Sequence, residues 1–173
     1  CGVLPAVLVP YFQKRCRDTD KILKAMYVAA GIGQIIATRS SISGAAGGCQ
    51  AEIGSASSMA AGALTYLQGG NCEQIATSAA MAMKNLLGLV CDPVAGLVEV
   101  PCVKRNVIGT VNAMACADMA MAGIVSRIPP DQVMDAMKEV GDKMDASLRE
   151  TALGGLAQTD EGMKIAEKMH ASY

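Results

Sequence analysis

Two long stretches without a charged side chain constrain the fold of this chain more than any other feature. One is Tyr27 to Ala37, at the centre of a predicted helix, and the other is Ile53 to Cys72. A helix that is apolar on all sides either lies buried among other helices or spans a membrane. The second stretch is long enough to span, but it is diluted with Ser, Gly, Gln and Asn. We therefore predict buried helices of a soluble bundle and no membrane partner.

The shortage of aromatic residues points to the same class of fold. The chain has no Trp, one Phe and four Tyr, and 51% of its 173 residues are hydrophobic. Such a core must be built from Ala, Met, Ile, Leu and Val, which favours close-packed helices over a β-sandwich. The length predicts one all-α domain over residues 1–173, a compact bundle of apolar helices.

Helical spacing and stop signals divide the chain into seven predicted helices. They cover residues 2–16, the stretch from a capping signal at 18–21 to about 38, and 53–67, 72–89, 106–126, 131–144 and about 161–170. Only the helix that follows Pro129-Pro130 is clearly amphipathic, so we expect it at the surface. Its apolar stripe consists of Val133, Met134, Met137, Val140, Gly141 and Met144.

Three of the seven cysteines stand in unusual settings. Cys91 and Cys102 bracket a segment broken by two prolines and a glycine, and Cys49 stands in the small-residue segment 43–55. Irregular loops of this kind can direct thiolates toward a common centre. Three thiolates can bind three irons of a cubane cluster and leave the fourth iron open as a Lewis acid. By pattern alone, three cysteines in Gly/Pro-rich turns are more often ordinary cysteines than cluster ligands.

The other cysteines, Cys1, Cys16, Cys72 and Cys116, have plain neighbours and are predicted to be small core residues or surface thiols. An odd number of cysteines without a signal peptide favours a reducing cytosol over a disulfide framework.

Several other function classes are excluded by what the chain contains. With 15 basic and 16 acidic residues the net charge is −1, and no run of Lys or Arg predicts nucleic-acid binding. The single histidine, His170, is close to the end of the chain, which argues against a His-based zinc site or a catalytic triad. No phosphate-binding loop is present, and Gly31-Ile32-Gly33 lies within a predicted helix.

The segments 41–54 and 91–106 resemble the α chain, or α domain, of the bacterial iron–sulfur L-serine dehydratases. The resemblance runs from Cys1 to about Gln158. It implies an all-helical fold in which Cys49, Cys91 and Cys102 bind a 4Fe-4S cluster. It also implies β-elimination of water from L-serine, giving pyruvate and ammonia without pyridoxal phosphate.

The resemblance leaves the remaining site residues to chemical reasoning. Lys104, two residues after Cys102, is the basic residue nearest to the cluster cysteines in sequence, so we expect it to be the base that removes the α-proton. Ser43 and Asn106 are expected to bind the carboxylate or the amine of the substrate. We expect Glu52 and Asp92 to hold the cysteine loops by accepting backbone hydrogen bonds.

Two departures from the family limit the inference. The family carries a Thr/Pro/Asn/Gly segment before the position of Cys1, and it has a β chain or β domain with a Ser/His motif. We therefore expect an N-terminally truncated piece of a longer chain, of the two-subunit type, which assembles as an oligomer with a β partner and is inactive alone.

Three alternatives remain open. A lyase that acts on threonine or cysteine would use the same cluster and differ in the shape of its pocket. A redox protein would need a fourth thiolate, from Cys1, Cys16, Cys72 or Cys116. A helical interaction module without a cluster would bind no iron.

Overall fold

The computed structural model describes residues 1–171, except for the side chain of His170, and they form helices and no strand. The all-α prediction is confirmed. The α-helices are α1 (Val3–Lys14), α2 (Thr19–Arg39), α3 (Gly44–Gly47), α4 (Ser55–Leu67), α5 (Cys72–Lys84), α6 (Cys102–Met121), α7 (Pro130–Lys143) and α8 (Asp160–His170). Four shorter helices join them: a π-helix, η1 (Gln50–Gly54), and the 3₁₀-helices η2 (Val94–Gly96), η3 (Ala146–Leu148) and η4 (Gly155–Gln158).

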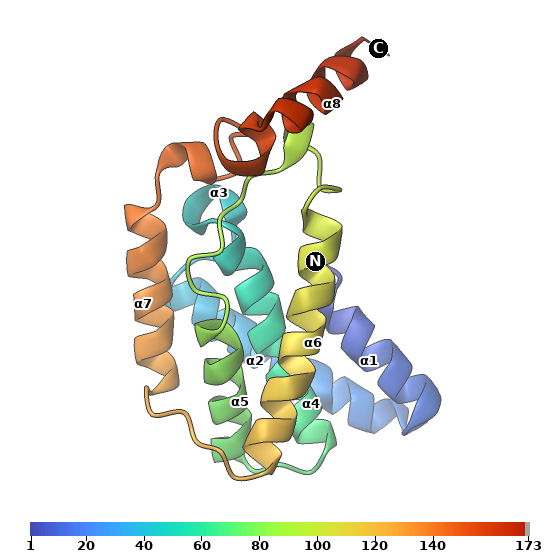
Figure 1. Ribbon diagram of the computed structural model, residues 1–173. Coiled ribbons are helices and arrows are strands. Elements are labelled where there is room, and N and C mark those ends of the chain that lie inside the picture. Colours follow the sequence, from blue (N-terminus) through green and yellow to red (C-terminus); the bar gives the residue numbers. More distant parts are fainter. Residues whose placement is uncertain (172–173) are drawn as a thin grey trace.

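Helix α4 lies at the centre of the bundle, against α1, α2, α5 and α6 (Figure 1). Apart from Met59 and Tyr66, every residue of this helix is buried. Its small side chains let the neighbouring helices approach closely: a Cβ on Gly62 would lie 2.2 Å from Cδ1 of Ile32 in α2. The prediction of a buried helix at 53–67 is confirmed.

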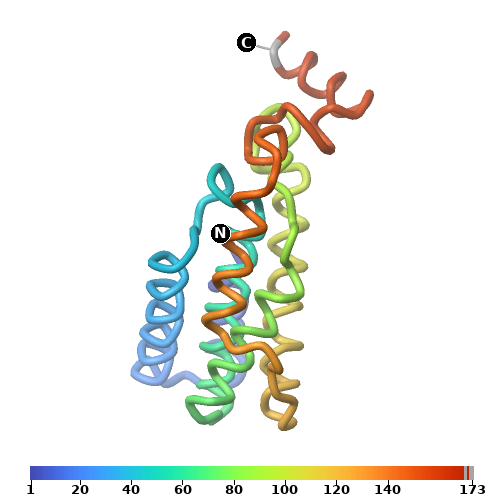
Figure 2. The backbone as a smooth tube through the Cα atoms, turned by 90° about the vertical axis from the view of Figure 1, so that its left-hand side faces the viewer, coloured from blue at the N-terminus to red at the C-terminus, as the bar shows by residue number. Residues whose placement is uncertain are grey.

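The prediction that α2 is buried is wrong. Only Ala25, Ala29 and Ile36 of this helix are buried, and the side chain of Tyr27 is 68% exposed. Figure 2 shows α2 as a light-blue column at one edge of the molecule. The uncharged stretch of either α2 or α4 could have filled the centre of the bundle. Helix α4 does so, because it has the smaller side chains and packs against more neighbouring helices. Helix α2 therefore keeps an apolar outer face.

Three helix boundaries differ from the prediction by four residues or more, and one of them is the end of α6, at Met121 rather than at residue 126. Helix α5 ends at Lys84 rather than at residue 89, because the chain turns through Gly88, whose φ is 84°. Helix α6 begins at Cys102 rather than at Asn106, since nothing after Pro101 breaks the helix. Cys102 is thus in the first turn of a helix and not in a loop.

The amphipathic prediction for α7 is confirmed. Its buried residues are Val133, Met134, Met137 and Gly141, and the helix packs on α5 and α2. Near its C-terminal end, a Cβ on Gly141 would lie 2.9 Å from Cα of Gly47. This close approach holds α3 against α7.

The irregular parts of the fold gather at one end of the bundle. Figures 1 and 2 show α3, the segment leading into α6, and the chain from η3 to α8 at the same end. Cys1 also lies there, since its thiol donates a hydrogen bond to Asn106 Oδ1 at 3.1 Å. Among the described helices, none combines the length and hydropathy needed to cross a membrane.

Gly48 provides a test of the packing at this end. Its φ is 75°, and a Cβ there would lie 2.5 Å from Sδ of Met144 and 3.0 Å from the carbonyl oxygen of Leu89. We expect Gly48→Ala to lower the free energy of unfolding by about 2–3 kcal/mol, measured by urea denaturation.

Gly69→Ala is the matched control, because Gly69 also has a positive φ, of 90°, but a Cβ would meet nothing within 4 Å. It should cost about 1 kcal/mol, from backbone strain alone. Equal effects of the two substitutions would contradict the packing described here.

Candidate metal centre

Three thiols from separate segments lie near one another at the irregular end of the bundle. Cys49 joins α3 to η1, Cys91 lies between α5 and η2, and Cys102 begins α6. Cys49 and Cys91 are buried and Cys102 is partly buried, and all three are free thiols. Burial is the main cause of the raised pKa of Cys91, and negative charge on Cys49 and on Cys102 raises it further, so the three thiols are close enough to interact electrostatically.

Burial keeps these thiols protonated in the protein alone. It raises the pKa of Cys49 to about 11 and that of Cys91 to about 12, and it also raises the pKa of Cys102. The positive charge of Arg105 acts in the opposite direction on Cys49 and Cys102. Because a metal binds the thiolate, loading such a centre must displace protons from the thiols.

Gln50 fixes the position of Cys49, and the sequence analysis missed this role. The Gln50 N–H donates to the carbonyl oxygen of Leu89 at 2.8 Å. Its side-chain Nε2 donates to Met137 O at 3.0 Å, and its Oε1 accepts from the Gly88 N–H at 2.9 Å. The buried amide thus joins three parts of the fold beside the thiol. The feature of the sequence that could have indicated this role is a single Gln in a segment of mostly small residues.

The backbone of Cys91 is held on both sides by the segment before η4. Its N–H donates to Leu148 O at 2.8 Å, and its carbonyl oxygen accepts from the Glu150 N–H at 2.8 Å. The two bonds form an isolated parallel bridge between Cys91 and Arg149. This segment, far away in the sequence, therefore sets the position of the second thiol.

Asp92 joins the Cys91 segment to the start of α6. Its Oδ1 accepts from Nη1 of Arg105 at 2.8 Å, and its Oδ2 accepts from the Leu156 N–H at 2.8 Å. Arg105 also donates to Val90 O at 2.7 Å. The Asp92 and Arg105 side chains are only 4% and 14% exposed. The prediction that Asp92 accepts a backbone hydrogen bond is confirmed.

A cavity of about 250 Å³ opens beside the thiols. It is lined by Cys1, Cys49, Glu52, Ile53, Val98, Cys102, Val103 and Asn106. Cys91 lies just beside it: a Cβ on Gly44 would be 3.0 Å from Glu52 Oε2 and 3.1 Å from Cys91 Sγ. Glu52, which we expected to hold a loop, faces this cavity.

The donor set suits a cluster better than a single ion. In the part of the chain that the structure describes, no three His, Cys, Asp or Glu side chains converge on one metal position. A cubane cluster distributes its ligands over several irons, so their sulfur atoms stand farther apart. Three thiols from separate segments beside a cavity, with the partly buried Arg105 to offset their charge, are compatible with such a cluster.

Of the other predicted site residues, only some lie at the cavity. Asn106 lines the cavity, where its Oδ1 accepts from the Gly2 N–H at 2.6 Å and its Nδ2 donates to Cys102 O at 2.9 Å. Lys104 is exposed and does not line the cavity, and Ser43 is exposed at the start of α3. The cation whose charge acts on Cys49 and Cys102 is Arg105 instead.

Comparison with known proteins gives one consistent family. Residues 1–157 match the family described as serine dehydratase alpha chain. The chain is 53% identical over 168 residues to the probable L-serine dehydratase alpha chain of Bacillus subtilis, which covers 97% of this chain and 56% of that protein. It is 53% identical over 164 residues to the corresponding protein of Latilactobacillus sakei, covering 95% and 78%.

A longer relative matches over the same region. The chain is 46% identical over 159 residues to the L-serine dehydratase TdcG of Escherichia coli, covering 91% of this chain and 35% of that protein. The chain thus spans between about a third and three quarters of the length of these relatives.

The buried ion pair gives a prediction for the geometry of the thiols. Asp92→Ala leaves the Arg105 guanidinium buried without its partner, so we expect the free energy of unfolding to fall by about 3 kcal/mol. We also expect the Cys91 thiol to react faster with a thiol reagent. Urea denaturation and a timed labelling assay would measure the two effects.

Asp135→Ala is the control, since it removes the partner of Arg39 in an exposed ion pair of 2.7 Å. It should change stability less and leave the Cys91 labelling rate unchanged. An Asp92→Ala variant as stable and as slowly labelled as this control would refute the role given to the ion pair.

Proposed function

The chain belongs to the serine dehydratase alpha-chain family, and on that basis we propose that it is the cluster-binding part of an enzyme that eliminates water from L-serine. The products would be pyruvate and ammonia. The main support is the set of three free thiols, Cys49, Cys91 and Cys102, gathered from separate segments beside one cavity. The names of the relatives support the substrate.

We propose that these three thiolates hold a 4Fe-4S cluster, without pyridoxal phosphate. When bound, such a cluster supplies an iron with no protein ligand, a Lewis acid that makes hydroxide a better leaving group. The protein contributes position and charge. The Asp92–Arg105 ion pair and the Gln50 amide hold the three segments, and Arg105 offsets the negative charge of the thiolates.

Removal of the α-proton needs a base. Lys104, our choice from the sequence, would have to reach the cavity from an exposed position on α6, so a group on the partner chain is the alternative. Ser43 would likewise have to turn inward to bind the substrate. Asn106 already lines the cavity and needs only to exchange its bond to the Gly2 N–H for one to the substrate.

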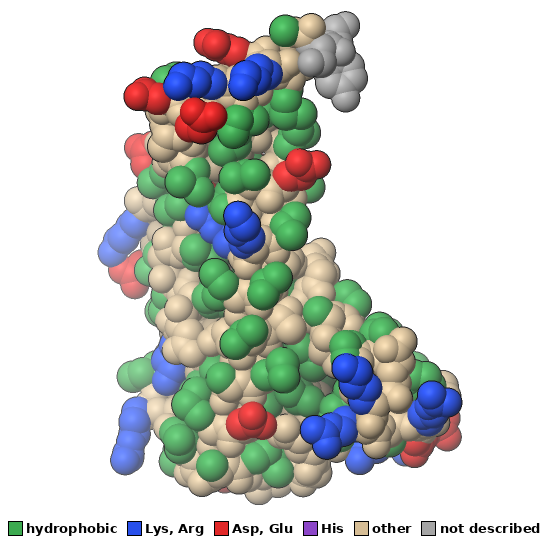
Figure 3. Space-filling model, turned by 45° about the vertical axis from the view of Figure 1, so that its right-hand side comes forward, with side chains coloured by type: hydrophobic (Ala, Val, Ile, Leu, Met, Phe, Trp, Pro, Cys, Tyr) green, Lys and Arg blue, Asp and Glu red, His purple; other side chains and the backbone are tan. Residues whose placement is uncertain are grey.

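A β chain is the proposed partner, in an oligomeric enzyme. The designation of the relatives as alpha chains supports this. Exposed apolar side chains follow one side of α6 from the thiol end: Val103, Val107, Ile108, Val111 and Met114. Figure 3 shows hydrophobic side chains spread over the middle of this face, with charged groups mainly at its upper end, its left edge and its lower right. Such a surface is typical of a region covered by another chain.

One observation favours a second candidate, an iron–sulfur redox protein. Cys1 lines the same cavity as Cys49 and Cys102. As a fourth thiolate it would close the open iron, and the centre would then transfer electrons rather than bind substrate.

The two candidate functions, serine dehydratase and redox protein, differ in which cysteines are needed to hold the cluster. In the full-length enzyme with its β chain, reconstituted anaerobically, we expect Cys49→Ser, Cys91→Ser and Cys102→Ser each to lose cluster iron and serine dehydration. Iron analysis, visible spectroscopy and pyruvate assays measure these effects.

Cys72→Ser is the control, because Cys72 is exposed at the start of α5, and it should keep both iron and activity. Loss of the cluster in Cys1→Ser, without serine turnover by the parent enzyme, would favour the redox protein. Full iron content in all three ligand variants would rule out the proposed centre. Comparison of serine with threonine and cysteine as substrates would decide the lyase class.

A further inference from the structure

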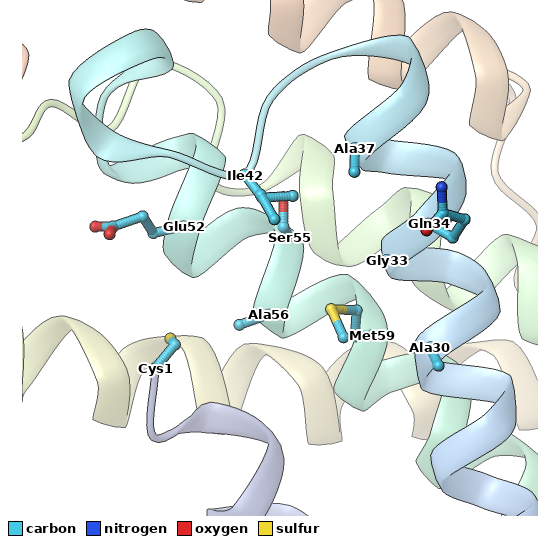
Figure 4. Close-up of a pocket in the computed structure, with 10 residues that line it drawn as sticks. All are labelled: Cys1, Ala30, Gly33, Gln34, Ala37, Ile42, Glu52, Ser55, Ala56 and Met59. Carbon is cyan, nitrogen blue, oxygen red and sulfur yellow. The ribbon is translucent and has the colours of Figure 1, made fainter.

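A second cavity of about 390 Å³ lies between α2 and α4, next to the thiol cavity (Figure 4). It is lined by Cys1, Ala30, Gly33, Gln34, Ala37, Ile42, Glu52, Ser55, Ala56 and Met59. Cys1 and Glu52 line both cavities, so the two are neighbours. Small side chains on α2 leave room for a small molecule within reach of the thiols.

Ser55 carries an unsatisfied buried hydroxyl in this second cavity. The residue is only 3% exposed, and its Oγ has no hydrogen-bond partner. The other buried hydroxyls of α4 are all bonded: Ser57 to Gly109 O, Ser58 to Ala79 O and Thr65 to Ala61 O. A buried hydroxyl without a partner costs free energy, so a ligand that bonds to it would recover that cost.

The local backbone places Ser55 beside Glu52. The π-helix η1 ends at Gly54, and the N–H of the next residue, Ser55, donates to the carbonyl oxygen of Glu52. Both residues line the same cavity from the same stretch of chain, and Figure 4 shows the Glu52 carboxylate directed away from Ser55, on the side where Cys1 lies. Single π-helical turns within α-helices are common at functional sites, because they turn side chains away from regular helical positions.

The charged and polar side chains that line the cavity determine which chemical group of a ligand can bind there. Glu52 is an acidic residue, Ser55 and Gln34 can accept hydrogen bonds, and no Lys or Arg is among the lining residues. Such a set suits a cationic group with several N–H donors better than a carboxylate.

We propose that Ser55 Oγ accepts a hydrogen bond from the ammonium group of the amino-acid substrate, with Glu52 giving the cavity the negative charge that favours a cation. This inference rests on the function proposed above and adds a substrate-binding residue to it. An ammonium group held here leaves the carboxylate and the hydroxyl of serine directed toward the cavity of Cys49 and Cys102, where the cluster would lie.

The test is Ser55→Ala in the full-length enzyme with its β chain. We expect kcat/KM for L-serine to fall about tenfold or more, mainly through KM, because a hydrogen bond to a charged group is lost. The thermal midpoint should stay the same or rise, because the substitution removes an unsatisfied hydroxyl. Iron content and the cluster spectrum should not change.

Ser58→Ala is the matched control, since Ser58 is equally buried in α4 but its hydroxyl is bonded to Ala79 O. This variant should be less stable and keep the KM of the parent enzyme. An unchanged KM in Ser55→Ala, or equal changes of KM in both variants, would overturn the inference.

Glycerate has a hydroxyl group in place of the ammonium group of serine. Its inhibition constant therefore tests whether Ser55 recognises the ammonium group or another part of the substrate. If the inhibition constant of glycerate rose as much as KM for serine, Ser55 would not be specific for the ammonium group, and the assignment would be wrong. If the parent enzyme did not turn over serine at all, the proposed function would fail. A normal parent with an unaffected Ser55→Ala variant would defeat only the present inference.

Discussion

The buried ion pair between Asp92 and Arg105 connects the parts of the structure on which the candidate centre depends. Asp92 follows one thiol in the chain, and Arg105 lies one turn of α6 beyond another. The other oxygen of the same carboxylate accepts a hydrogen bond from the backbone N–H of Leu156, which connects the C-terminal region to the ion pair. Buried charges are tolerated only when they are paired and hydrogen-bonded, which makes the relative position of these segments strongly specified. The same guanidinium then offsets the charge of the thiolates.

The centre also depends on the close packing of α4. Small residues along this helix let α2, α5 and α6 approach, and their hydroxyls are satisfied by neighbouring carbonyl groups. At the N-terminal end of the helix this pattern changes. The chain forms a π-helix after Cys49, and the hydroxyl of Ser55 is left without a partner. The end of the helix that carries the thiol is therefore also the end where packing leaves two adjoining cavities.

The sequence was sufficient for the class of fold and for the three cysteines as a candidate set. Periodicity identified α7, whose buried positions are regularly spaced, and the absence of charge identified α4, which is buried except at Met59 and Tyr66. The sequence could not decide which of two helices with long uncharged stretches is central, so α2 was predicted to be buried although it lies at the edge. The roles of Gln50 and Arg105 were also missed, since each depends on partners distant in the sequence: Gln50 on Met137, and Arg105 on Asp92 and Val90. Lys104 was favoured by its nearness in sequence, but helical geometry leaves it exposed while Arg105 is partly buried.

The central claim is that three thiols of this chain hold a cluster with one iron free to bind substrate. Mössbauer spectroscopy of the full-length enzyme, reconstituted with ⁵⁷Fe and its β chain, tests this most directly. The account predicts that one iron of the cluster is distinct from the others and that its signal alone shifts when L-serine is added. A cluster whose irons all stay unchanged with serine, or a protein that retains no iron after reconstitution, would contradict it.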